Sequence, residues 1–281
     1  MVSMTARRSR VAGAGWGVRT WLGVALPDRR TIAVVRRHVD VYRELLFINL
    51  MLAVAEPTLA LLVMGLALGQ FVDLGLDAEY IVFVAPGVVA MFAMFSTVGE
   101  SLWGGYLRLA QQDLFGAMLA TPARAEDIAA GEIVWGALRG TISVAAVLMV
   151  LAVLTPAWGL IASPLVILII PVAFLMGLLF AALVIAYIGY ARTIHHLMYY
   201  FTIVINPIFW FSGAFFPLDQ LPGWAQTLGW FNPLTHVVDI FRALSAGDLT
   251  WAVAGDVLWL AVVTPPLCWL AIWSLRRRLI R

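Results

Sequence analysis

Six apolar stretches constrain the fold of this chain more than any other feature of its sequence. They run over residues 45–69, 80–103, 133–157, 160–188, 198–216 and 251–275. A transmembrane helix needs roughly 20 mostly apolar residues, and backbone polar groups inside lipid must be paired within the protein. The stretches therefore predict an all-α integral membrane protein with six membrane-spanning helices.

The amino-acid composition supports this interpretation. Of the 281 residues, 63% are hydrophobic and 12% are charged, whereas a typical soluble domain is about 45–50% apolar and about 25% charged. So few charges do not cover the surface of a water-soluble protein of this size. The composition argues against a soluble enzyme, a disordered protein and a nucleic-acid-binding protein, and it indicates that the lipid bilayer surrounds most of the chain.

The basic residues exclude a further group of functions. All 18 are arginines, and the sequence contains no lysine. A phosphate-binding P-loop uses a lysine to reach the β- and γ-phosphates of its nucleotide, so we do not expect this chain to hydrolyse ATP by itself. The single cysteine, Cys268, excludes an internal disulfide and a multi-cysteine metal site. We predict no catalytic residue and no metal site.

The positions of the arginines predict the orientation of the chain. Sixteen of the 18 precede the first stretch, follow the second or fourth, or lie in the C-terminal tail. Because cytoplasmic segments of membrane proteins carry excess arginine, we expect both termini in the cytoplasm. Residues 1–30 are expected to form a mobile basic tail, and residues 31–281 the six-span domain.

Residues 31–46 precede the first stretch and have the pattern of an amphipathic helix. One face carries most of its charges, which include Arg36, Arg37, Asp40 and Arg43. The opposite face repeats apolar residues at helical spacing, namely Val35, Val39, Tyr42 and Leu46. Such a helix is expected in the inner membrane interface, either as a simple anchor or as a mechanical link to a cytoplasmic partner.

The longest cytoplasmic loop, residues 104–131, contains a second amphipathic segment over residues 106–120. Leucines and a phenylalanine that are exposed outside the bilayer need a groove to cover them, and a partner protein can supply one. The candidate contact residues are Arg108, Gln111, Gln112, Asp113, Leu114, Phe115 and Leu119.

The external connection, residues 215–250, is too apolar to lie in water, yet its prolines and glycines prevent a single helix. Two short helices that dip into the outer leaflet fit this pattern, with Trp224 and Trp230 at headgroup depth. Asp239 and Arg242 are three residues apart, and we expect them to form an ion pair in the second helix.

Glu56 lies beside Pro57 in the middle of the first stretch. A charge at this depth costs about 2.5–3.5 kcal/mol on insertion scales. Glu56 is therefore expected to face protein or a wet cavity, or to be protonated, and both a functional and a structural role remain open.

Several motifs in one order point to a known family. The strongest is residues 211–222, FSGAFFPLDQLP, followed by residues 232–242, NPLTHVVDIFR. Earlier matches are the Ala-Glu-Pro of residues 55–57 and residues 117–122, AMLATP. With these motifs the chain resembles the type-2 permease subunits of bacterial ATP-binding-cassette exporters, and among them the permease family of nodulation lipooligosaccharide exporters.

The resemblance implies a homodimer in the bacterial inner membrane with two copies of a separate ATPase subunit, which binds ATP and Mg²⁺; no cofactor is implied on this chain. It makes residues 106–121 the coupling helix for that ATPase, although Gly116 stands where related permeases usually have an acidic residue. The substrate path that it implies includes Glu56, Glu100, Tyr199, Phe209, Trp210 and Phe211. The external gate that it implies includes Phe215, Phe216, Asp219, His236, Asp239 and Arg242.

The transported molecule stays open at this point. A lipid-linked or acylated saccharide is favoured by the resemblance, and aromatic side chains of the fifth stretch suit such a path by stacking on sugars. A drug-efflux permease has the same architecture. An ion-coupled transporter that uses Glu56 as a proton site and a membrane enzyme are more distant alternatives. Whether two identical chains or two paralogues form the pore also stays open.

Overall fold

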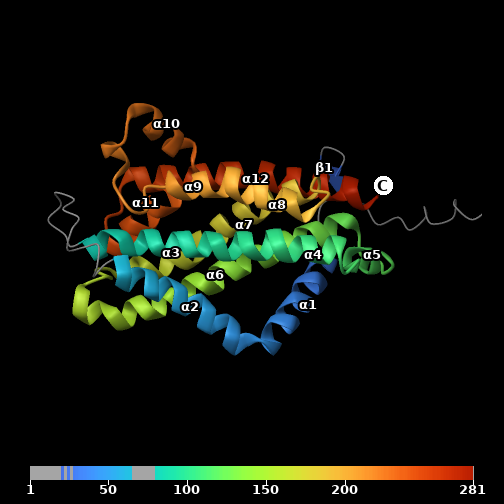
Figure 1. The fold of residues 1–281 in the computed structure, drawn as a ribbon, viewed down its shortest axis with the longest axis horizontal. Coiled ribbons are helices and arrows are strands. Elements are labelled where there is room, and N and C mark those ends of the chain that lie inside the picture. The colour runs from blue at the N-terminus through green and yellow to red at the C-terminus, as the bar shows by residue number, and fades with distance from the viewer. Residues whose placement is uncertain (1–19, 22–23, 26–27, 65–79, 281) are drawn as a thin grey trace, which may run out of the picture.

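The computed structural model describes residues 20–21, 24–25, 28–64 and 80–280. Most of these residues form helices that run along one common direction (Figure 1). A pair of two-residue strands, β1 (Thr20–Trp21) and β2 (Val24–Ala25), is antiparallel. The predicted basic tail of residues 1–30 lies largely outside the described residues.

The first half of the chain supplies the helices that later form the candidate site. They are α1 (Arg30–Glu44), α2 (Leu46–Leu62), α3 (Tyr80–Gly99), the π-helix η2 (Glu100–Gly104), α4 (Gly105–Ala110), α5 (Leu114–Leu119) and α6 (Ala125–Trp158). Residues 80–110 are one continuous helical run, since η2 and α4 extend α3.

The second half supplies the remaining helices, among them two within residues 215–250 that are predicted to lie on the external side and are named the external helices. The remaining helices are the 3₁₀ helix η3 (Pro164–Leu168), α7 (Ile169–Ile188), α8 (Ile194–Tyr200), the π-helix η4 (Phe201–Ile205), α9 (Asn206–Trp210), the 3₁₀ helix η5 (Leu218–Gln220), α10 (Gly223–Phe231), α11 (Pro233–Ala246) and α12 (Trp251–Leu279).

Four helical segments of the described chain are long and apolar enough to cross a membrane: Tyr80–Ala110, Ala125–Pro156, Pro164–Ile188 and Trp251–Leu279. A fifth is present if α1 and α2, which are bent by 82° at their junction, count as one span. The structure thus confirms an all-helical membrane protein, and the count of six spans stays a prediction.

The predicted fifth stretch, residues 198–216, is helical only as far as Trp210. The chain then turns, and Gly213 adopts a left-handed conformation with φ 71°, which a side chain would strain. Residues 212–214 are buried beneath the external helices. The last part of the predicted stretch is therefore a tight turn.

Close packing of α6 on α3 depends on two glycines. A Cβ atom at Gly136 would lie 2.3 Å from the Ser101 hydroxyl, and one at Gly140 would lie 2.2 Å from the Thr97 hydroxyl. This spacing of small residues, four apart, lets membrane helices approach closely. Helix α7 packs against α6, and its Phe180 is among the largest fully buried side chains of the core.

The segments predicted to be cytoplasmic lie at one end of the bundle. Helix α1, the α4–α5 segment and the C-terminal end of α12 lie together, while α10 and α11 lie at the other end (Figure 1). The three arginines Arg276, Arg277 and Arg278 follow the apolar part of α12 at the first of these ends.

Helix α1 confirms the predicted amphipathic helix, but the side that it buries is rotated. Its buried residues are Val34, His38 and Tyr42, so of the predicted apolar face Tyr42 is correct, whereas Leu46 is 41% exposed. His38 is included because its ring has partners on α6. A polar residue with a buried partner thus overrides the apolar pattern.

Candidate functional site: an ion-pair network beside a polar groove

A network of charged side chains joins four helical elements at the end of the bundle that carries α1. The carboxylate of Glu132 on α6 is fully buried and lies 2.6 Å from Arg108 Nη2 on α4. It also lies 2.9 Å from His38 Nε2 on α1. Arg108 donates a second hydrogen bond of 2.9 Å to Glu100 on η2, and Arg139 Nε on α6 is 3.5 Å from the other Glu100 oxygen.

Because the network is buried, the removal of one charged side chain leaves another without its partner. A charge that is removed from water is costly unless it is paired and hydrogen-bonded. Glu132 is at the centre because both of its oxygens are engaged, one by His38 of α1 and one by Arg108 of α4. The position of α1 is therefore tied to the position of α4.

Aromatic contacts fix α1 on α6 beside the network. The His38 ring stacks on Trp135 with a centroid distance of 5.4 Å, and Tyr42 meets the same indole edge-on at 5.7 Å. The Arg139 guanidinium lies 4.7 Å from the centre of the Tyr42 ring, within the range of a cation–π contact. We name His38, Glu100, Arg108, Glu132 and Arg139 the charge network.

The predicted coupling segment, residues 106–120, is broken into two helices. Residues 111–113 separate α4 from α5, and Asp113 has a left-handed backbone with φ 46°. Phe115 is only 1% exposed and belongs to the hydrophobic core. The expectation that Phe115 is an exposed partner contact is therefore wrong, because the break turns it toward the bundle.

The exposed side of this segment is small and polar. Gln111, Gln112 and Asp113 are exposed, Leu114 and Leu119 are half-buried, and Arg108 is engaged in the charge network. The Asp113 carboxylate lies beside Gly116, where a Cβ atom would be 2.6 Å from it. The Asp113 carboxylate therefore fills the space beside Gly116, the position at which the permeases that this chain resembles usually have an acidic residue.

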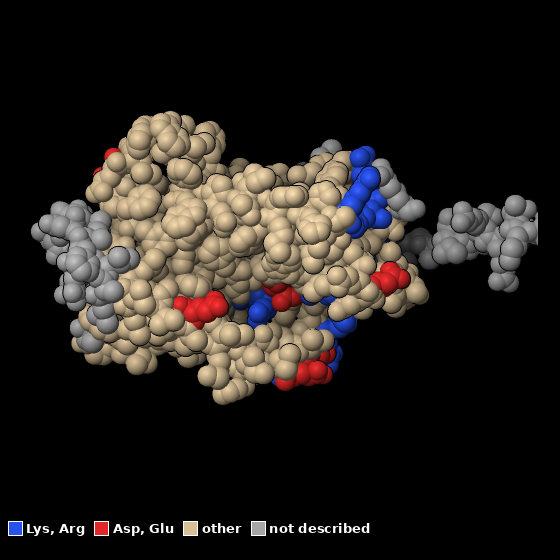
Figure 2. Space-filling view, viewed as in Figure 1, with Lys and Arg blue, Asp and Glu red and all other residues tan. Residues whose placement is uncertain are grey.

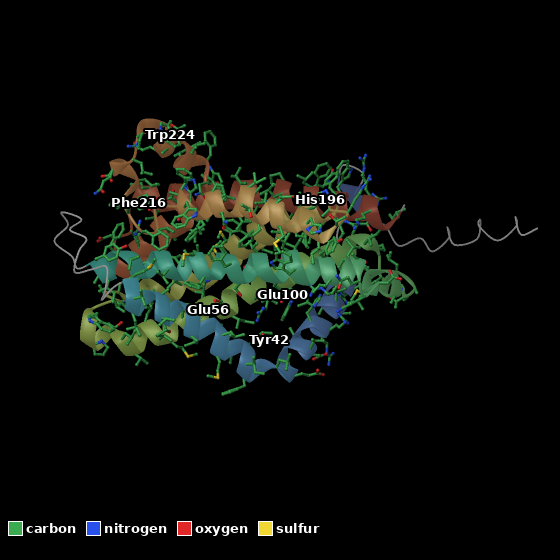
Figure 3. All side chains as sticks on the ribbon, viewed as in Figure 1. Tyr42, Glu56, Glu100, His196, Phe216 and Trp224 are labelled. Atoms are coloured by element: carbon green, nitrogen blue, oxygen red, sulfur yellow. The ribbon has the colours of Figure 1, made fainter. Side chains whose placement is uncertain are left out.

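A groove lies between the α1–α2 bend and helices α3 and α6. It is one cavity with two parts of about 260 and 310 Å³, and Asn49 and Arg139 line both parts. Figure 2 shows a hollow there with acidic and basic side chains inside it. Glu56, Glu100 and Tyr42 are distributed along its length (Figure 3).

The lining of this groove combines polar and aromatic groups. Its membrane-side half is lined by Asn49, Leu52, Ala53, Glu56, Pro57, Phe92, Phe95, Ser96, Arg139 and Ser143. The prediction that Glu56 faces a cavity is confirmed. A groove with two ionisable groups, hydroxyls and phenyl rings can bind the polar part of a ligand by hydrogen bonds and a ring by stacking.

The aromatic residues predicted for the path divide between two sides of the helix. Phe209 contacts Phe95 of the groove lining with a centroid distance of 5.2 Å and Trp210 with one of 4.8 Å, so these two rings lie next to the groove, although neither of them lines it. Phe211 instead packs against Trp224 at 6.0 Å. Tyr199 is 63% exposed on the outer surface of α8. Phe209 and Trp210 are thus placed together with the groove, and the other two are not.

At the opposite end, Arg242 holds the external helix α11 in place. It donates hydrogen bonds to the carbonyls of Gly213 at 2.7 Å and Ala214 at 3.2 Å, and its guanidinium lies 3.8 Å from the Phe83 ring centre. The predicted pair with Asp239 is present at 3.8 Å, but the carbonyl contacts are shorter. Burial lowers the pKa of Arg242 to about 10.

His236 holds the same helix, α11, against α12. One ring nitrogen, Nδ1, lies 2.7 Å from the Asp256 carboxylate and the other, Nε2, lies 2.9 Å from the Trp230 carbonyl. Because both partners are acceptors, both nitrogens must carry protons. Burial disfavours the charged ring, but the hydrogen bonds to Asp256 and Trp230 outweigh it and raise the pKa of His236.

The remaining residues of the predicted gate lie around the region that Arg242 and His236 hold in place. Phe215 and Phe216 are half-buried, and Phe216 lies near α11 at the external end (Figure 3). Asp219 is exposed on η5. The two predicted short helices, α10 and α11, are confirmed, with Trp224 and Trp230 63% and 58% exposed.

Sequence reasoning missed three members of the charge network as functional residues: His38, Glu132 and Arg139. A signal was present, since Glu132, Trp135 and Arg139 recur at helical spacing on one face of an otherwise apolar helix. Their partners on α1, however, are far away in sequence. In the described part of the chain, no group of three potential ligands is arranged to hold a metal ion.

Ionisable residues in membrane helices that face a cavity mark pathways for substrates or ions. The fold and the groove therefore define a polytopic membrane transport protein. The chain belongs to the ABC-2 type transporter family, whose sequence profile matches residues 30–245. Membership implies an ATP-binding partner subunit and makes this chain a transport component.

Individual relatives extend over almost the whole chain. It is 34% identical to Nodulation protein J of Rhizobium leguminosarum bv. trifolii over 254 residues, which cover 89% of this chain and 94% of the relative. It is 32% identical to Nodulation protein J of Bradyrhizobium diazoefficiens over 251 residues, or 89% and 94% of the two chains. It is 24% identical over 230 residues to the inner membrane transport permease YadH of Escherichia coli, or 80% and 86%.

Proposed function

We propose that the chain is the permease subunit of an exporter that moves an acylated or lipid-linked saccharide outward from the cytoplasm or the inner leaflet. The observation that carries this proposal is the groove beside α2, which offers Asn49, Glu56 and Arg139 to a polar group and phenyl rings to a sugar face. Similarity to Nodulation protein J supports an amphiphile of this class.

The same groove offers a route for the acyl part of the substrate. Phe95 lines the groove and contacts Phe209, which in turn contacts Trp210, and Trp210 is 58% exposed on the outer surface. The polar head is bound between α2 and α6 while the chain lies along these rings toward lipid. An amphiphile thereby keeps both of its parts in the surroundings that each prefers.

Energy comes from a separate ATPase that binds ATP and Mg²⁺, two copies of which dock beneath a homodimer of this permease. The docking face is the exposed side of the α4–α5 segment, formed by Gln111, Gln112 and Asp113 together with half-buried Leu114 and Leu119. A push there reaches Glu132 through Arg108 and then α1 through His38. The motion is a rigid-body shift of packed helices.

The membrane arrangement completes this proposal. Helix α2 and the α8–α9 helix are the first and fifth of six spans, α1 lies in the inner interface, and both termini are cytoplasmic in a bacterial inner membrane. The arginine asymmetry supports this orientation, and so does the family relative named as an inner membrane permease.

The proposal is tested in proteoliposomes that contain the permease and its cognate ATPase. We expect ATP-dependent transport of a fluorescent acylated oligosaccharide, and Arg139→Gln should reduce it at least tenfold, because the loss of a hydrogen bond from a charged group costs about 1.5–3 kcal/mol. The matched control is Glu44→Gln, on the exposed side of α1 outside the groove.

Three other results would contradict the proposal. Transport that is driven by an ion gradient without the ATPase would assign the chain to ion-coupled transporters, with Glu56 as the titrating site. ATP-dependent transport of an apolar drug but not of the saccharide would favour the drug-efflux reading. Unchanged saccharide transport by Arg139→Gln would remove the groove from the path.

One separate observation supports the alternative that the chain is a drug-efflux permease. A second cavity of about 520 Å³ lies between α7, α9, α10 and α12 and is lined almost wholly by apolar side chains. Such a cavity suits a ligand without charge. Ile208→Trp, which fills this cavity, should reduce drug transport if the reading is correct and leave saccharide transport intact.

A further inference from the structure

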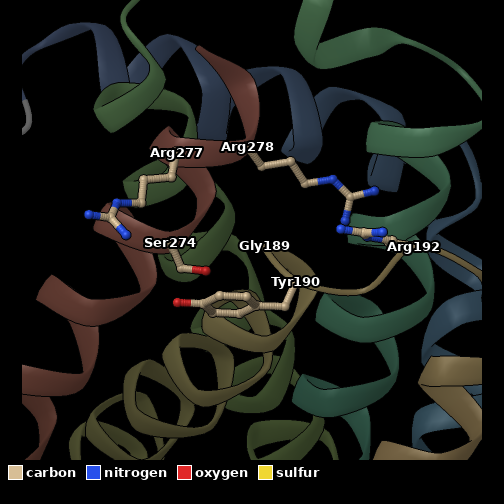
Figure 4. A pocket seen from close by; sticks show the side chains of 6 residues that line it. All are labelled: Gly189, Tyr190, Arg192, Ser274, Arg277 and Arg278. Atoms are coloured by element: carbon tan, nitrogen blue, oxygen red, sulfur yellow. The ribbon is translucent and has the colours of Figure 1, made fainter. Parts of the chain in front are cut away.

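A third cavity, of about 350 Å³, lies at the end of the bundle that carries the C-terminus. It is enclosed by the last turn of α7, the loop that follows it and the basic end of α12. Its lining residues are Gly189, Tyr190, Arg192, Ser274, Arg277 and Arg278 (Figure 4). It is separate from the groove and from the charge network, and the proposed function does not use it.

The charge of this cavity is unbalanced. Within the described part of the chain, no carboxylate lies within 4.0 Å of Arg192, Arg277 or Arg278, whereas the adjacent Arg276 pairs with Glu126 at 3.2 Å. The side chains of Arg192 and Arg278 extend toward each other (Figure 4). Two like charges in this position repel each other, and an anion between them removes that repulsion.

Arg278 is held in position by backbone carbonyls at and just after the end of α7. Arg278 donates hydrogen bonds to the carbonyls of Ile188 and Ala191. Ser274 donates one of 2.7 Å to the carbonyl of Ala186, and α12 approaches so closely that a Cβ atom at Gly189 would lie 2.0 Å from the Ser274 hydroxyl. The cavity is thus a built part of the fold, because its wall is made by a close helix crossing.

Aromatic residues place the cavity at the level of lipid headgroups. Trp269, Trp273 and Arg277 are each four residues apart on one face of α12, so their side chains lie in a row. The two indoles stack with a centroid distance of 6.2 Å, and Arg277 lies 3.7 Å from the Trp273 ring centre. Tyr190 is 62% exposed at the mouth. Tryptophan, tyrosine and arginine gather in this way where hydrocarbon meets headgroups.

We propose that this cavity binds the phosphate of an anionic phospholipid from the inner leaflet. Arg192 and Arg278, whose side chains extend toward each other at the cavity (Figure 4), contact the phosphate oxygens, and the acyl chains lie along the Trp269–Trp273 face. A lipid accounts for both observations, since its charge matches the arginines and its chains match the aromatic row. A free phosphate matches only the first.

The test uses the purified full-length chain in nanodiscs of phosphatidylcholine with a small fraction of phosphatidylglycerol. Phosphatidylglycerol brominated on its acyl chains should quench tryptophan fluorescence more than brominated phosphatidylcholine does. The double variant Arg192→Gln/Arg278→Gln should weaken the preference for phosphatidylglycerol roughly tenfold or more, since each arginine near an anionic surface contributes about a fivefold factor.

The control variant is Arg36→Gln/Arg43→Gln, which removes two arginines from α1 at the same end of the molecule without touching the cavity. It should keep the preference. Arg192→Lys/Arg278→Lys, which retains the charge, should keep most of it and shows that a loss in the glutamine variant is not due to misfolding.

Three results would overturn the proposal. Equal loss in the α1 control would show that general attraction to the anionic surface is enough. Equal quenching by the two brominated lipids would exclude selectivity. Release of brominated phosphatidylglycerol by millimolar inorganic phosphate would assign the cavity to a free anion. None of these results bears on saccharide transport, so the proposed function stands or falls separately.

Discussion

The two ends of the helical bundle both bury cationic side chains, but they hold them with different partners. At the α1 end, Arg108 and His38 are held by the carboxylate of Glu132, which is itself a side chain. At the α11 end, Arg242 is held by the backbone carbonyls of Gly213 and Ala214. The first arrangement joins three helices through rotatable groups, and the second fixes one turn to one helix.

This difference assigns different mechanical roles to the two ends. The members of a side-chain network can exchange partners when the helices that carry them shift, because each charge is held by a rotatable side chain. A guanidinium bound to carbonyls of a tight turn follows that turn as a unit. We therefore expect the α1 end to change when the ATPase acts, and the external helix to move as a rigid piece.

The strongest way to break this comparison is Glu132→Ala. This substitution removes one of the two carboxylates that pair with Arg108 and the only carboxylate of the described residues that pairs with the His38 ring. Because both side chains are buried, the loss should lower the free energy of unfolding by about 3–5 kcal/mol. We expect a lower unfolding temperature in detergent and loss of transport. The exposed Glu44→Gln is the control, and an unchanged unfolding temperature in Glu132→Ala would show that the network does not stabilise the bundle.

Phe115→Ala tests the correction made to the coupling segment. A phenylalanine that is 1% exposed leaves a cavity when it is truncated, with a cost of about 3 kcal/mol or more. Thermal unfolding monitored by circular dichroism measures it. A loss of ATPase coupling at unchanged stability would instead mean that this ring does face the partner.

Arg242→Met should have a smaller effect, confined to the external end. The thioether keeps much of the volume, but the carbonyls of Gly213 and Ala214 lose their donor, which costs about 2 kcal/mol. Hydrogen exchange measured by mass spectrometry should rise in residues 211–217 and in α11. Arg242→Lys is the matched variant, and it should recover only part of the protection because one ammonium cannot reproduce the fork of a guanidinium.

Increased exchange in α1 of Arg242→Met would contradict the comparison. The two ends of the bundle would then respond to the substitution together, and α11 would not move as a separate rigid body.

The sequence predicted the elements whose signal is local. Stretches of about 20 apolar residues indicate spans. Glu56 beside Pro57 was expected to face protein or a wet cavity, or to be protonated, and the structure shows that it lines a cavity. The prolines and glycines of residues 215–250 indicated two short external helices, which are α10 and α11.

The sequence did not predict contacts between distant residues. His38 and Glu132 are 94 residues apart, and no periodicity on α1 reveals that a histidine rather than a valine turns inward. Phe115 was misplaced because an amphipathic pattern does not show where a helix breaks. The left-handed Asp113 that breaks it depends on the space left by Gly116.

The smallest effect on stability, and the sharpest test of the coupling end, is expected from Asp113→Asn. Asparagine tolerates the left-handed backbone of this position as well as aspartate does, and the side chain is exposed, so the free energy of unfolding should change by less than about 0.5 kcal/mol. If the ATPase reads the acidic group beside Gly116, ATP-dependent transport should fall severalfold while ATP hydrolysis continues. Asp40→Asn, an equally exposed carboxylate on α1, should leave transport unchanged. Equal transport by both variants would move the docking face away from Asp113, and the charge network would then receive its push from another surface.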